Sequence, residues 1–214
     1  MSLKQLGLIL ALNLYLSSSA LAAHDQVDSD HLLPIFLTLF FHDQLTDQEI
    51  AGVKSDNLDW FLKELTEVTG RRTHVITKRH QPGITDFGYR TGDSTQAIEQ
   101  WRQRLSAYLH ANNLPLDSRR HKYVLVTRHN LTHDVGGIAR VQMNEAIASL
   151  RAYINIAHEV GHLFGATHEN AYFRLAALPP CRTLMYPNHT ALVANCYEFS
   201  ESNREAIRHY LKDE

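Results

Sequence analysis

The order of apolar and polar positions predicts strands and helices that follow one another along the chain. Three runs rich in branched and aromatic residues have the length of buried strands, namely residues 33–41, 73–78 and 123–127. Apolar residues at helical spacing predict four helices, over residues 57–68, 94–111, 146–164 and 201–211. The succession of strand, helix, strand, helix, strand indicates an α/β fold with a largely parallel sheet and right-handed crossovers.

A shorter run at residues 136–143 alternates only weakly and begins with two glycines. Its polar content suits the edge of a sheet better than the centre. We therefore expect an edge strand that is entered through a glycine turn.

Length and composition indicate a single folded unit. The chain has 214 residues, of which 44% are hydrophobic and 21% charged, with a formal net charge of −2. This composition is typical of ordinary soluble globular proteins, and it gives no reason to expect a nucleic-acid partner. No internal repeat or long linker interrupts residues 23–214.

The first 22 residues have the pattern of a secretory signal peptide. Lys4 gives a positive start, residues 6–16 are mostly apolar, and Ala20-Leu21-Ala22 forms a cleavage pattern. A membrane anchor is the alternative, but the apolar run is short and contains Asn13. We expect a secreted or periplasmic protein without a stable membrane anchor, in which residues 23–32 form a short leader.

Only two cysteines occur, Cys181 and Cys196. An exported protein meets oxidising conditions, which favour a disulfide between them. Two buried free thiols are the alternative.

One stretch carries recognisable chemistry. His158 and His162 are four residues apart, so on a helix both imidazoles lie on one face and can share a metal ion. Glu159 beside them matches the pattern in which a glutamate takes a proton from the water that zinc activates. Gly165 can end the helix in a left-handed turn, which would return His168 as a third ligand and leave one position open. A helix that merely carries surface histidines is the alternative.

His158-Glu159-x-x-His162-x-x-Gly165-x-x-His168 resembles the motif of the metzincin zinc endopeptidases. The resemblance implies one catalytic zinc ion, Glu159 as general base, and Met185 in the family's methionine turn as an apolar floor beneath the metal. An ordinary core methionine is the alternative for Met185. The subfamily features are mixed, with reprolysin-like, matrixin-like and astacin-like elements.

The resemblance also implies an architecture for the catalytic domain at residues 33–214. We expect an upper lobe of residues 33–168, with a twisted five-stranded, mostly parallel sheet and long helices, and a smaller irregular lobe of residues 169–214. The substrate, a protein or peptide, would pair with the edge strand at Ile138, Ala139 and Arg140, because an extended peptide can add to an exposed sheet edge.

Two rival functions stay open, a zinc-binding protein without catalysis and an interaction module on the same scaffold. Glu159 favours the enzyme, because binding zinc alone does not require it. Some metzincins are silenced by a propeptide cysteine, but no cysteine precedes the motif here. We therefore expect a protein that is active on export or restrained by a separate inhibitor.

Overall fold

The fold is organised around a five-stranded sheet with the strand order β2-β1-β3-β5-β4. The computed structural model describes residues 32–116, 119–187 and 193–212, so the predicted signal peptide and nearly all of the predicted leader lie outside the described residues. The strands are β1 (Ile35–Phe41), β2 (Thr73–Lys78), β3 (His121–Thr127), β4 (Gly137–Ala139) and β5 (Glu145–Ser149). Only β4 runs antiparallel to its neighbour, so the predicted mixed, mostly parallel α/β sheet is confirmed.

Burial along the strands follows their place in the sheet. Six of the seven residues of β3 and all five residues of β5 are buried, as expected for strands covered on both faces. All three residues of β4 are only half-buried, because this strand has a neighbour on one side alone. The predicted edge strand is thus confirmed, although it is shorter than predicted.

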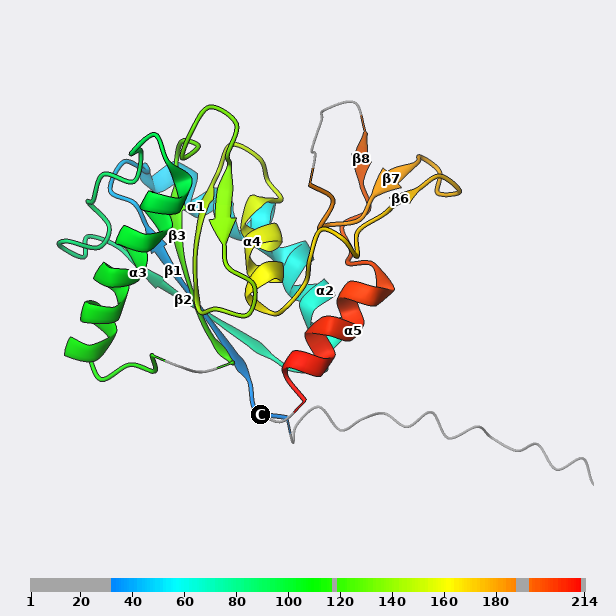
Figure 1. Cartoon of the computed structure of the whole chain (residues 1–214), viewed down its shortest axis with the longest axis horizontal. Coiled ribbons are helices and arrows are strands. Elements are labelled where there is room, and N and C mark those ends of the chain that lie inside the picture. Colours follow the sequence, from blue (N-terminus) through cyan, green and yellow to red (C-terminus); the bar gives the residue numbers. More distant parts are fainter. Residues whose placement is uncertain (1–31, 117–118, 188–192, 213–214) are drawn as a thin grey trace, which may run out of the picture.

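Helices cover both faces of the sheet (Figure 1). One face packs on α3 (Ser94–Ala111), whose Trp101 meets Phe40 of β1 edge to face. The other face packs on α2 (Asp59–Thr69) and α4 (Asn155–Leu163), which share one hydrophobic core with β1 and β3. The predicted boundaries of α3 are confirmed.

Two predicted helices need correction. The helix predicted from residue 57 is the second half of a longer helical stretch, which begins with α1 (Asp47–Val53) and passes through a π-helical turn (Lys54–Leu58) into α2. Polar residues in α1 hide its helical stripe, although Thr46 and Glu49 form a capping box at its start.

The helix predicted over residues 146–164 is wrong in its first part, because this segment includes most of β5. This segment lies between β3 and β4 in the sheet, and pairing with both overrides the helical preference of its alanines. The helix α4 begins only at Asn155.

The C-terminal part of the chain is small and irregular. It holds a three-stranded sheet, β6 (Phe173–Arg174), β7 (Cys181–Arg182) and β8 (Ala194–Asn195), followed by α5 (Glu201–Tyr210). The predicted disulfide joins Cys181 to Cys196 and is confirmed. Arg204 of α5 ties this part to α2 through Glu64, at 2.7 Å. None of the described helices has the length and apolarity needed to cross a membrane.

Candidate metal centre

Helix α4 places two of the three predicted ligands. His158 and His162 lie one turn apart on a helix whose residues from 156 to 163 are all buried. The helix ends at Leu163 and is capped by Phe164, and Gly165 follows with φ of 95°, in the region that favours glycine. Backbone bonds from Gly165 to His162 and from Ala166 to Gly161 close this turn. The chain then returns toward the helix, as predicted, and brings His168 to the other two histidines.

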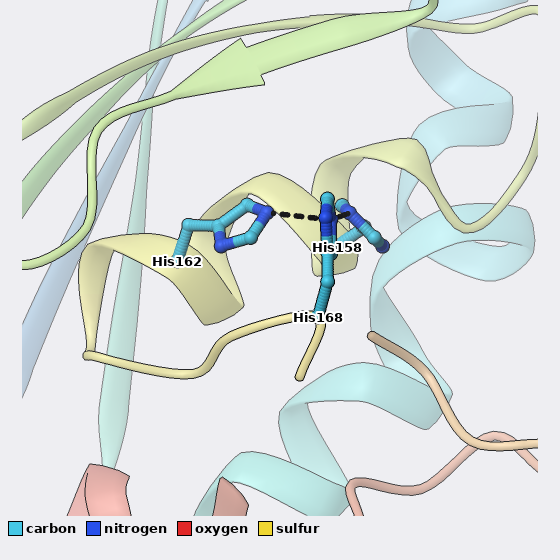
Figure 2. A group of neighbouring side chains, drawn as sticks. All are labelled: His158, His162 and His168. Carbon is cyan, nitrogen blue, oxygen red and sulfur yellow. Dashed lines mark hydrogen bonds between the residues drawn. The ribbon is translucent and has the colours of Figure 1, made fainter. Parts of the chain in front are cut away.

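The three imidazoles point toward one another (Figure 2). The Nε2 atom of His168 lies 2.9 Å from Nε2 of His158 and 3.1 Å from Nε2 of His162. The three candidate ligand atoms lie within 4.8 Å of one another. Nitrogen ligands of a tetrahedral zinc ion are about 3.3 Å apart, given zinc–nitrogen bonds of about 2.0–2.1 Å. The spacing therefore suits a small metal ion with imidazole ligands.

Backbone carbonyls fix the orientation of two of these rings. His158 Nδ1 lies 3.0 Å from the carbonyl oxygen of Leu184, and His162 Nδ1 lies 2.9 Å from that of Ala166. A carbonyl can only accept, so each Nδ1 carries the proton and each Nε2 presents a lone pair. Burial lowers the pKa of His162, which favours the neutral ring that a metal requires. Imidazoles whose Nε2 lone pairs converge, and whose Nδ1 atoms donate to backbone carbonyls, have the arrangement of metal ligands.

Glu159 lies beside the histidines but is not a member of the cluster that could hold a metal. Its side chain is buried, and burial raises its pKa to about 8. The carboxylate packs against the backbone of Gly137, where a side-chain carbon would lie 2.5 Å from Glu159 Oε1. Only glycine fits at this position without a shift of the glutamate.

Met185 packs against α4 at Gly161. It is fully buried, and a side-chain carbon on Gly161 would lie 2.7 Å from its sulfur. The preceding residue, Leu184, supplies the carbonyl that orients His158. The turn that contains Met185 thus contacts both the helix and one histidine. The guanidinium of Arg182 lies over the ring of the next residue, Tyr186.

A cleft of about 520 Å³ opens over the histidines. Ile138 and Ala139 line it, together with Pro187 from the C-terminal part of the chain. Arg140 is not among the lining residues, and its guanidinium instead reaches Glu99 of α3 at 3.3 Å. Two of the three predicted substrate-binding residues therefore border the cleft.

Sequence reasoning missed several other cleft residues. Asn130 and Asn155 line it, and Gly136 and Gly137 allow β4 to approach α4 closely. The glycine pair was the available signal, but it was interpreted as a turn. Neither glycine has a positive φ, so what they provide is the absence of a side chain.

Comparison with known proteins found a solved structure that has a similar fold. Neither a family model nor a curated protein matches the sequence. The structure is similar to that of a zinc-dependent peptidase from Methanocorpusculum labreanum (strain Z), with a TM-score of 0.50 and 19% sequence identity, over 80% of this chain and 99% of that chain. At this identity the similarity supports the fold.

Proposed function

We propose that this protein is a zinc-dependent endopeptidase of the metzincin type. The observation that carries the proposal is the convergence of three histidine Nε2 atoms beside a buried glutamate, at the floor of an open cleft. The similarity in fold to a zinc-dependent peptidase agrees with it. So does the placement of Met185 under the helix that carries His158 and His162.

His158, His162 and His168 would hold the ion. Bound zinc supplies Lewis-acid chemistry, which lowers the pKa of water and polarises a peptide carbonyl. The carbonyl of Leu184 keeps His158 in the tautomer that leaves Nε2 unprotonated, and the carbonyl of Ala166 does the same for His162.

Glu159 would move the proton. Burial raises the pKa of Glu159, and the positive charge of a neighbouring ion would oppose this and favour the carboxylate. In this proposal, the carboxylate accepts a proton from the attacking water and then donates it to the leaving amine, so that the peptide bond breaks into an acid and an amine. The side chain packs against Gly137, where only glycine leaves room for the carboxylate. A protein that only bound zinc would have no need of this buried carboxylate, which favours the enzyme over a non-catalytic zinc protein.

The substrate would be an extended peptide that pairs with β4. This strand forms one edge of the described sheet and borders the cleft, so its outer side can accept another strand. We further propose that the protein is exported. The disulfide is compatible with an oxidising compartment.

The proposal is tested with a peptide blocked at both ends, so that only an internal bond can be cut. We expect the zinc-loaded protein to produce two fragments, measured by mass spectrometry, and a chelator to stop the reaction until zinc is returned. Intact peptide after incubation with folded, zinc-loaded protein, over a broad peptide mixture, would favour the non-catalytic alternative.

A further inference from the structure

The cleft continues past Glu159 toward the start of α4, where polar side chains line it together with Val135 and Ala152. Asn130, Asp134, Arg151 and Asn155 line this end. Asn155 precedes Glu159 by four residues, so both side chains lie on one face of the helix, about 6 Å apart along its axis.

Two consecutive glycines lie against these two side chains, Gly136 just before β4 and Gly137 at its start. A side-chain carbon on Gly136 would lie 2.7 Å from Asn155 Nδ2, and one on Gly137 would lie 2.5 Å from Glu159 Oε1. The strand and the helix therefore advance in the same sense. An extended peptide alongside advances about 3.3 Å per residue. A substrate side chain at Asn155 would therefore lie about two residues along the peptide from the bond that is cut beside Glu159.

Hydrogen bonds fix the amide of Asn155. Its Nδ2 donates to the carbonyl and to the hydroxyl of Ser149, both at 3.1 Å, and lies 3.4 Å from the carbonyl of Gly136. The same hydroxyl donates to Oδ1 of Asn130 at 2.8 Å. Because only oxygens surround Nδ2, the orientation of this amide is set by its network.

This network leaves one acceptor and one donor at the end of the cleft. Within the described part of the chain, Asn155 Oδ1 accepts no hydrogen bond and Asn130 Nδ2 donates none. Both residues are half-buried, and the other end of each amide is held by Ser149.

We infer that Asn155 and Asn130 form a subsite for an amide side chain, so that the peptidase prefers glutamine or asparagine within two residues of the cut bond. This inference rests on the proposed function. An amide offers a donor to Asn155 Oδ1 and an acceptor to Asn130 Nδ2. An apolar side chain leaves both groups without a partner. A lysine offers only donors and would lie beside Arg151, so Asn130 Nδ2 stays without an acceptor. A carboxylate offers only acceptors, so Asn155 Oδ1 stays without a donor.

The test is cleavage-site profiling of a mixed peptide library by mass spectrometry. The zinc-loaded protein should favour an amide residue over leucine by about tenfold at one position, the usual scale of a hydrogen bond. Asn155→Leu, which keeps the number and branching of the side-chain heavy atoms but removes the amide, should lose this preference and gain cleavage beside apolar residues. Gln96→Leu replaces an exposed amide on α3 outside the cleft and should keep the original profile.

A second variant and a second readout guard against misfolding. Asn130→Ala leaves α4 untouched and should also weaken the preference. Binding of uncleaved amide and leucine peptides to Glu159→Ala, with and without Asn155→Leu, should differ in the same way. Identical profiles for the wild type and both subsite variants would overturn the inference while leaving the peptidase intact. No cleavage by the folded, zinc-loaded wild type would overturn the proposed function, and this inference with it.

Discussion

At the scale of single residues, Gly137 sets the position of Glu159. An added carbon would lie 2.5 Å from Oε1 and 2.7 Å from Cγ of the glutamate, so Gly137→Ala must displace the carboxylate. We expect kcat/KM to fall by about 100-fold, the effect of misplacing a catalytic group by about 1 Å. Zinc stoichiometry should stay at the wild-type value, because none of the three nearest atoms belongs to a histidine.

The matched control for this prediction is Gly88→Ala. A side-chain carbon there meets no atom within 4 Å, so activity should not change. Equal kcat/KM for Gly137→Ala and Gly88→Ala, measured at equal zinc loading, would show that Gly137 does not position the glutamate.

At the scale of elements, α4 rests on the methionine turn through Gly161. A side-chain carbon there would lie 2.7 Å from Met185 Sδ and 2.8 Å from Phe199 Cε1. Alanine favours a helix over glycine by about 1 kcal/mol, but overpacking a core costs about 1–3 kcal/mol. Because both contacts are too close for a carbon atom, we expect Gly161→Ala to lower the free energy of unfolding, measured with urea.

Gly52→Ala in α1 is the control for that change. Its new carbon meets only the exposed carboxylate of Asp56, at 3.2 Å, which can move away. We expect this variant to gain about 0.5–1 kcal/mol from helix propensity. If Gly161→Ala were equally stabilised, α4 would not be tightly packed on Met185.

The start of α1 is joined to the end of β3 by a pH-dependent contact. Hydrogen bonds from Arg128, at 2.9 Å, and from the backbone of Thr46 lower the pKa of Glu49 to about 2. A lowered folded-state pKa stabilises the protein above the unfolded value of about 4.3, and that stabilisation is lost as the pH falls toward 2. Urea unfolding should therefore show that Glu49→Gln costs more stability at pH 6 than at pH 3. An equal cost at both pH values would contradict this assignment.

At the scale of the whole molecule, the disulfide closes a loop of the C-terminal part that contacts the metal centre through Leu184. Met185 and Leu184 lie within the loop that Cys181 and Cys196 close, with a sequence separation of 15. Removing the bond with Cys181→Ser/Cys196→Ser should lower the free energy of unfolding by about 2–4 kcal/mol. Because Leu184 orients His158, zinc affinity should also fall, by about tenfold, in a competition titration.

Reducing agent supplies the control for the disulfide prediction. It should reproduce both effects in the wild type and change nothing in the double variant. Unchanged zinc affinity in the double variant would mean that the loop keeps Leu184 in place without the bond.

The sequence predicts the metal cluster well but β5 and the polar end of the cleft poorly. The histidine spacing and Gly165 were sufficient for the metal cluster, because helix geometry and a left-handed turn fix those positions locally. β5 was missed, because its strand conformation comes from pairing with β3 and β4 and not from its alanine-rich sequence. Asn130 and Asn155 were missed for a similar reason, since residues 25 apart in the chain meet only through Ser149.

The most direct test of the account compares hydrolysis of quenched-fluorescent casein by the wild type and Glu159→Ala at equal zinc loading. We expect the wild type to cleave casein, and Glu159→Ala to be at least about 100-fold slower, the scale of losing a general base. Glu205→Ala, an exposed change on α5, should cleave at the wild-type rate. Casein hydrolysis by Glu159→Ala at the wild-type rate would contradict the role of this glutamate.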